Sequence, residues 1–154
     1  MACSKLPSLL IVLWISYSAL SCKYRDGNDY SSIPDRKKYL QYITAGKQLY
    51  LEHCGNCHQD DGAGLARLYP PLKNSDFMNA DPERTLCIIK FGQRGMIKVN
   101  GVEFNMEMPS NSRLSGLELA EIATYVFSTF GNKPVLVTPD QMEALEPECK
   151  NSVN

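Results

Sequence analysis

Residues 53–64 read HCGNCHQDDGAG. Two cysteines, Cys54 and Cys57, stand three positions apart, and His58 directly follows the second of them. A short glycine-rich run that holds two thiols and an imidazole together points to redox, metal or cofactor chemistry. The compartment in which the chain works helps to decide among these possibilities, because it sets the redox state of the thiols.

The first 21 residues predict a secretory signal peptide. Lys5 precedes an apolar run over residues 9–20, and small residues stand just before Cys22, which is the layout of an export signal. The run is shorter than the roughly 18 apolar residues that a membrane-spanning helix needs. Cleavage after Ser21 would fit the small residues expected at positions −3 and −1. We therefore expect an exported, periplasmic protein.

Cys22 directly follows this cleavage site and resembles the acylated cysteine of a bacterial lipoprotein. Ala19 stands at position −3, where a lipoprotein signal usually has leucine. We expect a lipid at Cys22, which would anchor the protein to a membrane without spanning it. Residues 22–35 are polar and turn-rich, and they are expected to form a flexible tether between this anchor and the folded domain.

The balance of charge gives little support to nucleic-acid binding. The chain carries 16 Lys and Arg against 17 Asp and Glu. Loss of the signal removes only Lys5 from this count, which leaves a net charge of −2 and no basic stripe. The 133 residues that remain suffice for one domain of ordinary size. We expect this domain to span residues 36–132, with residues 133–154 as a C-terminal extension that either wraps around it or is mobile.

Cys87 and Cys149 are the two cysteines left over once the motif, the signal and Cys22 are accounted for. An oxidising compartment would permit a disulfide between them. Alternatively, Cys87 packs as a small apolar residue within the sequence LCII, and Cys149 is simply exposed.

Hydrophobic periodicity predicts three main helices, and the first two lead into and follow the motif region. The first begins at residue 35 or 36 and runs into the motif with tyrosine, leucine and isoleucine on its apolar face. The second begins with Asp81 as the N-cap and Pro82 as the first helical residue, and it stops at Gly92. The start and the end of this second helix are therefore both predicted from residue types that favour helix ends.

The third helix begins with a capping box formed by Ser115 and Glu118, and it ends at Gly131. Long loops over residues 59–80 and 93–113 separate the three helices. Loops of this length are unusual in a compact domain, and a large apolar prosthetic group between them would supply the missing core. The predicted fold class is therefore all-α, with three main helices and long loops wrapped around one bound group.

Three interpretations of the motif compete. A thioredoxin-like redox pair needs a βαβ context, which the predicted helices do not provide. A structural zinc site needs four ligands, and His53 is the only histidine besides His58. The third is covalent attachment of haem c, in which two thiols one helical turn apart reach two vinyl groups of one porphyrin. Because haem would also supply the missing core, we expect one haem c held by Cys54 and Cys57, with His58 as the proximal iron ligand.

A methionine is expected as the sixth ligand of the iron. His53 lies on the segment tethered to the proximal side, so it cannot readily reach the other face. Methionine is common in electron carriers, where it raises the reduction potential. Met108 lies in an irregular loop that can arch over the ring, and Pro109 would stiffen it, while Met106 is a rival two residues away. The other methionines after the motif are Met78, Met96 and Met142.

Residues 39–132 resemble class I cytochromes c, the family of small monohaem electron-transfer proteins. Gly46 and Tyr50 are similar to the glycine and aromatic of the family's N-terminal helix. Ile122 and Tyr125 are similar to the apolar and aromatic residues of the C-terminal helix. The resemblance implies that these two helices cross closely at the glycine.

The resemblance also extends to the loops. Pro70-Pro71-Leu72 is similar to the family's proline–x–leucine segment, which implies that the Pro70 carbonyl accepts a hydrogen bond from His58 Nδ1 and that Leu72 packs on the haem. The stretch GVEFNMEMP is similar to the family's distal pattern of glycine, aromatic, three residues, methionine and proline. That pattern has Phe104 as its aromatic and Met108 as the iron ligand.

These observations predict a one-electron carrier rather than an enzyme. The sequence resembles cytochromes that serve periplasmic dehydrogenases and reductases, which implies redox proteins as partners: a dehydrogenase or reductase as donor and an oxidase or another cytochrome as acceptor. One alternative is a haem-based sensor of small ligands, or a haem enzyme, with an open sixth position. It requires that Met108 does not bind the iron. A carrier of a non-haem metal on Cys54 and Cys57 is a further alternative.

Overall fold

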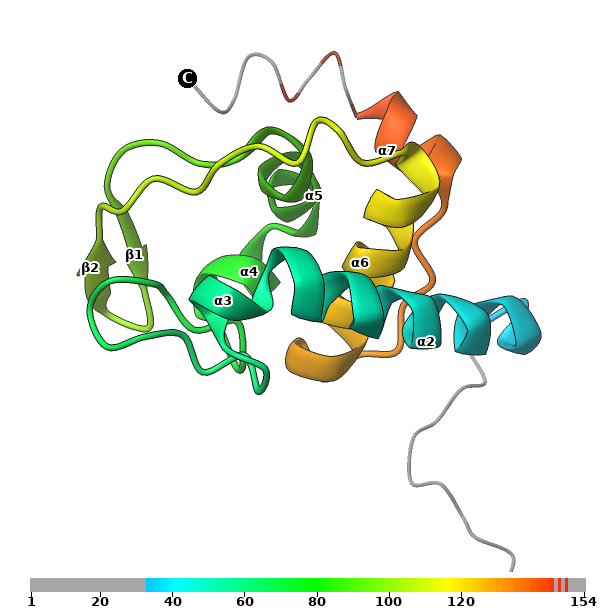
Figure 1. The fold of residues 1–154 in the computed structure, drawn as a ribbon, viewed down its shortest axis with the longest axis horizontal. Coiled ribbons are helices and arrows are strands. Elements are labelled where there is room, and N and C mark those ends of the chain that lie inside the picture. Colours follow the sequence, from blue (N-terminus) through cyan, green and yellow to red (C-terminus); the bar gives the residue numbers. More distant parts are fainter. Residues whose placement is uncertain (1–32, 146, 148, 150–154) are drawn as a thin grey trace, which may run out of the picture.

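The computed structural model describes residues 33–145, 147 and 149. The predicted signal peptide, Cys22 and all but the end of the predicted tether lie outside these residues. In the described part, no helix is both long and apolar enough to cross a bilayer. The helices, shown in Figure 1, are α2 (Arg36–His53), α3 (Gly55–His58), α4 (Asp76–Ala80), α5 (Pro82–Phe91), α6 (Gly116–Phe130) and α7 (Pro139–Ala144), and the strands are β1 (Ile97–Val99) and β2 (Val102–Phe104).

The three main helices were predicted correctly, and local capping explains their starts. α2 follows Asp35, whose carboxylate accepts a hydrogen bond from Lys38 N at 2.9 Å. α5 follows Asp81, which caps Arg84 N at 2.9 Å, and has Pro82 at its first position. In each case a side-chain oxygen satisfies an amide that the first turn leaves without a partner.

α6 begins with a complete capping box. Ser115 Oγ accepts a hydrogen bond from Glu118 N at 3.3 Å, and Ser115 N donates to the Glu118 carboxylate at 2.7 Å. The Glu118 carboxylate also accepts a hydrogen bond from Ser115 Oγ at 2.7 Å. The hydrogen bonds that the carboxylate accepts from Ser115 N and Ser115 Oγ lower the pKa of Glu118 below its ordinary value. A depressed carboxylate pKa means that this contribution to stability is present at neutral pH and is lost as the pH falls through the folded-state value.

We expect Ser115→Ala to lower the free energy of unfolding by about 1 kcal/mol, because the cap of α6 is lost. The variant should also show a shallower loss of stability on acidification, since Glu118 no longer has its hydroxyl partner. Denaturant unfolding followed by circular dichroism at neutral and acid pH measures both effects. Ser112→Ala, at an exposed position three residues earlier, is the control. Equal midpoints for the two variants would contradict the assignment of the cap.

The core lies where α2 crosses α6 (Figure 1), the largest interface between helices of the described chain. Tyr50 of α2 is fully buried, and its ring centroid lies 5.4 Å from Tyr125 and 5.2 Å from Phe130, both on α6. Such tilted aromatic pairs add to the stabilisation gained from their buried area. The Tyr50 hydroxyl donates to Gln59 O at 2.6 Å, so the same tyrosine also ties the core to the chain that follows the motif.

The structure differs from the all-α expectation at residues 97–104, which were predicted to be irregular. They form an antiparallel hairpin in which Ile97 pairs with Phe104 and Val99 with Val102. Asn100 and Gly101 both have positive φ, 49° and 81°, as a tight two-residue hairpin turn requires. The Asn-Gly pair between alternating apolar residues is the sequence signal that identifies such a hairpin, and it was missed.

The tail after α6 packs back onto the domain as far as the structure describes it. Val137 N donates to Thr124 Oγ1 of α6 at 3.0 Å, and Met142 of α7 is buried against the same core. Cys149 forms a disulfide with Cys87 of α5, so the pairing that the sequence left open is present. Both cysteines are buried, which excludes the alternative of an exposed Cys149.

Candidate haem site

The motif begins where α2 ends. Cys54 O accepts hydrogen bonds from Cys57 N at 3.1 Å and from His58 N at 2.9 Å. This single turn of helix, α3, brings both thiols and the imidazole to the wall of one cleft. Cys54 and Cys57 are the free cysteines among the described residues, so both thiols are available for covalent attachment.

His58 is held in one tautomer. His58 is only 8% exposed, and its Nδ1 lies 3.0 Å from Pro70 O. A carbonyl oxygen can only accept a hydrogen bond, so Nδ1 carries the proton and Nε2 keeps its lone pair. Burial lowers the pKa of His58, against the opposing effect of the Pro70 hydrogen bond. The result is a neutral imidazole with Nε2 ready to bind a metal, as a haem iron requires.

The loop after the motif folds back on itself to bring Pro70 to this position. His58 O accepts a hydrogen bond from Gly64 N at 2.9 Å, and Gly62 O accepts one from Leu72 N at 2.8 Å. Gly64 has a φ of 71°, and a Cβ there would come within 2.8 Å of Pro70 O. Only glycine allows this approach, so the hydrogen bond that the resemblance implied for Pro70 depends on Gly64.

The cleft is apolar, and its empty volume including the mouth is about 1000 Å³. This lining fits a porphyrin, because an apolar pocket with a few polar groups is typical of a cofactor site. All six predicted site residues line it: Cys54, Cys57, His58, Pro70, Leu72 and Met108. Further lining residues come from helices and loops far apart in the sequence: Met78, Thr85, Ile88, Ile89, Val99, Phe104, Ile122 and Val126.

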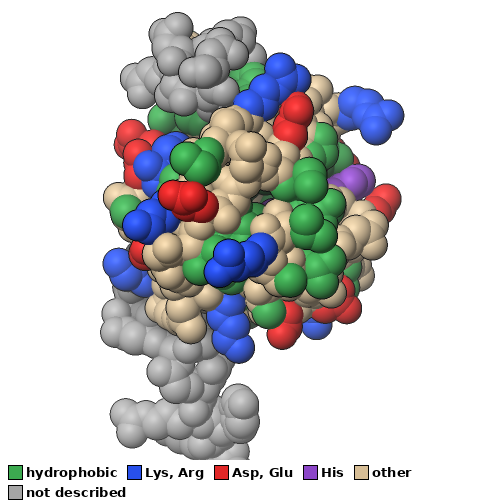
Figure 2. Space-filling view, turned by 90° about the vertical axis from the view of Figure 1, so that its left-hand side faces the viewer, with side chains coloured by type: hydrophobic (Ala, Val, Ile, Leu, Met, Phe, Trp, Pro, Cys, Tyr) green, Lys and Arg blue, Asp and Glu red, His purple; other side chains and the backbone are tan. Residues whose placement is uncertain are grey.

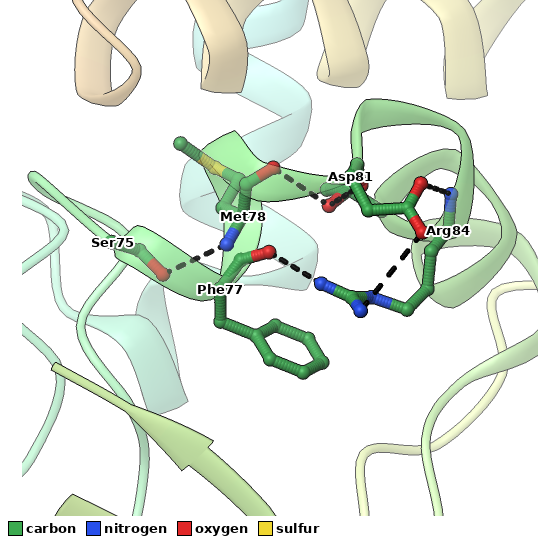
Figure 3. A network of polar contacts seen from close by, with 6 residues as sticks. Ser75, Phe77, Met78, Asp81 and Arg84 are labelled. Carbon is green, nitrogen blue, oxygen red and sulfur yellow. Dashed lines mark hydrogen bonds and ion pairs between the residues drawn. The ribbon is translucent and has the colours of Figure 1, made fainter. Parts of the chain in front are cut away.

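Phe77 is a wall residue that the sequence analysis missed. It lines the cleft and lies beneath the guanidinium of Arg84, 3.8 Å from the ring centroid to Arg84 Cζ. Arg84 Nη2 also donates to Phe77 O at 2.6 Å, while Ser75 Oγ caps Met78 N and Asp81 caps Arg84 N (Figure 3). This network fixes the α4–α5 corner. No local pattern in the sequence signals it, since it depends on how two helices meet.

The Cys54 thiol is poorly suited to act as a reactive redox thiolate. Burial raises the pKa of Cys54 to about 11, and the neighbouring Cys57 adds to this effect. A zinc ligand or reactive redox thiol works as the thiolate. Over residues 33–145, 147 and 149 there is also no group of three or more His, Cys, Asp and Glu side chains that could hold a metal ion.

Met108 is the sequence-predicted ligand that a separate loop brings to the cleft. It lines the cavity and is partly buried. Its rival Met106 also lines the cavity but is 49% exposed. Met96 is 66% exposed, whereas Met78 and Met142 are buried in the core. Met78, Met106 and Met108 therefore all line the cleft. Met106 and Met108 belong to the distal loop in which the sequence predicts the ligand, and Met108 is the more buried of these two.

The face beside the β1–β2 hairpin carries hydrophobic side chains among both basic and acidic ones (Figure 2). Several large apolar residues of the loops that frame the cleft are exposed, including Leu65, Leu68 and Met106. Because charges of both signs are interspersed on this face, it does not present the continuous basic surface typical of nucleic-acid binding.

The relatives of this chain carry names from electron-transfer systems. The cytochrome c subunit of a quinone-dependent alcohol dehydrogenase from Gluconobacter oxydans (strain 621H) is 30% identical over 106 residues, which is 66% of this chain and 22% of that protein. Cytochrome c-552 of Thermus thermophilus is 26% identical over 91 residues, 56% of this chain and 69% of its own length. Subunit CcoP of the cbb3-type cytochrome c oxidase of Rhodobacter capsulatus is 29% identical over 92 residues, which is 58% of this chain and 30% of that protein.

The chain thus spans about a fifth of the dehydrogenase subunit and over two thirds of cytochrome c-552. Residues 41–126 match the family model described as "Cytochrome C oxidase, cbb3-type, subunit III". These residues make up more than half of the chain and carry the thiols, the imidazole and Met108. The chain therefore belongs to this family of cytochrome c domains, as its resemblance to class I cytochromes c predicted.

Proposed function

We propose that this chain is a monohaem c-type cytochrome that carries single electrons between redox proteins of a periplasmic or membrane-surface respiratory or dehydrogenase chain. The observation that carries the proposal is the convergence of two thiols, a neutral imidazole and Met108 on one apolar cleft. Bound haem would supply the one-electron chemistry, because its iron alternates between two oxidation states.

The residues of the chain have distinct roles in this proposal. Cys54 and Cys57 would attach the haem through thioethers, and His58 and Met108 would bind its iron. Pro70 O orients His58 by accepting the hydrogen bond from Nδ1. This hydrogen bond keeps the proton on Nδ1 and makes the lone pair of Nε2 a stronger ligand for a metal. Leu72 and the other apolar lining exclude water, which tunes the reduction potential together with the methionine.

The proposed partners follow from the relatives and from the surface. The relatives include subunits of a dehydrogenase and of an oxidase, which supports a donor and an acceptor of these kinds. The exposed apolar side chains of the loop after the motif, such as Leu65 and Leu68, would let a partner dock without a strong requirement for one sign of charge. We also propose export and a lipid at Cys22. Both proposals rest on the sequence of residues 1–22, which lie outside the residues that the structure describes.

Met108→Ala should retain covalent haem and lose the methionine–iron charge-transfer band of the oxidised protein. Its reduction potential should fall, because a methionine ligand raises the potential. Oxidised and reduced visible spectra of protein co-expressed with haem-attachment machinery measure the band, and a haem stain on a denaturing gel measures attachment. Met106→Ala is the matched control, as it removes the neighbouring methionine two residues away, and it should keep the band.

Three results would overturn this proposal in whole or in part. Loss of the band in Met106→Ala alone would move the ligand to Met106. A wild-type protein that holds haem without the band, and whose reduced form binds carbon monoxide without denaturation, would favour the sensor with an open sixth position. A protein that does not stain for haem would reject the cytochrome reading altogether.

A further inference from the structure

The main chain of Met108 is held by a two-way hydrogen-bonded bridge. Gln93 N donates to Met108 O, and Met108 N donates to Gln93 O, each at 3.0 Å. Gln93 lies one residue after Gly92, which ends α5 and donates its own N–H to Ile88 O at 2.8 Å. Met108 is therefore attached, through its backbone, to the end of a helix that contributes Thr85, Ile88 and Ile89 to the cleft wall.

Gly92 also makes room for Met108. Its φ of 82° and ψ of −172° lie in a region that essentially only glycine adopts. A Cβ at this position would overlap the carbonyl oxygen of Met108, and it would lie 3.0 Å from both Pro109 C and Ser110 N. These neighbours are backbone atoms, so no side-chain rotation could relieve the overlap. The loop that carries Met108 can approach α5 only because residue 92 lacks a side chain.

We propose that the α5 corner, formed by Gly92 and Gln93, positions Met108 and keeps the loop that carries it closed over the cleft. This inference rests on the proposed role of Met108 as an iron ligand. The corner acts on the equilibrium between a closed loop, with Met108 at the cleft, and an open loop. Weakening the corner raises the population of the open loop, to which an added ligand binds.

Imidazole is a suitable probe, because it competes with methionine for the sixth position of a haem iron. Its apparent affinity scales with the fraction of protein whose loop is open. In the oxidised holoprotein, we expect Gly92→Ala to bind imidazole about tenfold more tightly than the wild type, because of the backbone strain and overlap it introduces. Its charge-transfer band should weaken and its reduction potential should fall.

Gly95→Ala is the matched control for this variant. Gly95 also has a positive φ, 80°, and lies three residues away, but a Cβ there would meet nothing within 4 Å. Gly95→Ala therefore introduces backbone strain without touching Met108, and its imidazole affinity should stay within about twofold of the wild type. A variant that was merely less stable would lower the unfolding midpoint without this difference between the two alanines.

A second pair of variants tests the corner if Gly92→Ala does not fold. Gln93→Pro removes the N–H that donates to Met108 O and leaves Gly92 unchanged. Gln93→Ala keeps that N–H and loses only the side chain, which donates to Arg94 O. We expect Gln93→Pro to bind imidazole severalfold more tightly than Gln93→Ala, with a weaker band.

The two hypotheses fail in distinguishable ways. A wild-type holoprotein without a methionine–iron band, or one whose band survives Met108→Ala, overturns the role of Met108 and with it this inference. A normal wild-type band together with equal imidazole affinities within each pair of variants overturns the α5 corner alone. Tighter binding in Gly92→Ala or Gln93→Pro than in its control supports the corner.

Discussion

Gly46→Ala should destabilise the protein by roughly 3 kcal/mol, although alanine is the better helix former. In an isolated helix this substitution would stabilise by about 1 kcal/mol. Here a Cβ on residue 46 would overlap the carbonyl oxygen of Glu121 and lie 2.6 Å from Glu121 C, in the backbone of α6. Because the obstacle is main chain, α2 and α6 must separate, and overpacking of a close interface costs about this much.

The sign of the effect makes this a sharp test of the α2–α6 crossing. Thermal unfolding of the holoprotein should show a midpoint about 10 °C or more below that of the wild type. Gly116→Ala is the control, because Gly116 is also helical and its nearest neighbours to an added Cβ lie 3.8 and 3.9 Å away. We expect it to be neutral or slightly stabilising. A Gly46→Ala protein as stable as Gly116→Ala would show that the helices do not cross as closely as described.

The parts of the fold that were predicted from sequence are those with strong local signals. Asp81-Pro82 and the Ser115–Glu118 box fix helix starts through hydrogen bonds within three residues. The Cys54-x-x-Cys57-His58 run is likewise local, since one helical turn brings its side chains together. The prediction that Pro70 accepts a hydrogen bond from His58 came from family resemblance, because periodicity alone gives no reason for a loop to return twelve residues later.

The features that sequence reasoning missed or left open depend on contacts between distant segments. Phe77 lines the cleft, and Arg84 stacks on it across the α4–α5 corner. Gly92 could be read as a helix stop, but its contact with the carbonyl of Met108 requires knowing where the distal loop lies. The hairpin at Asn100-Gly101 is different, since its turn signal is local and was missed. Its two strands are only three residues long and so add little periodic pattern of their own.

The disulfide between Cys87 and Cys149 is the second feature with a large expected effect. It closes a segment with a sequence separation of 62 residues, which includes the hairpin, the distal loop, α6 and α7. In the chain-entropy account, a crosslink over a loop of this length stabilises the folded state by up to about 4 kcal/mol, because it restricts the unfolded chain. Both cysteines are buried, so the crosslink also fixes the tail against α5.

We expect Cys87→Ala/Cys149→Ala to unfold at least about 10 °C below the wild type under oxidising conditions. Replacing both cysteines avoids a free thiol that could compete with Cys54 or Cys57 during haem attachment. Reductant should lower the wild-type midpoint towards that of the double variant and leave the variant itself unchanged, while a thiol titration of the wild type should rise by two groups. If those two thiols appear and the midpoint does not move, the crosslink does not stabilise the fold. The packing of Val137 and Met142 on the core would then be sufficient to hold the tail, because those contacts do not depend on the disulfide.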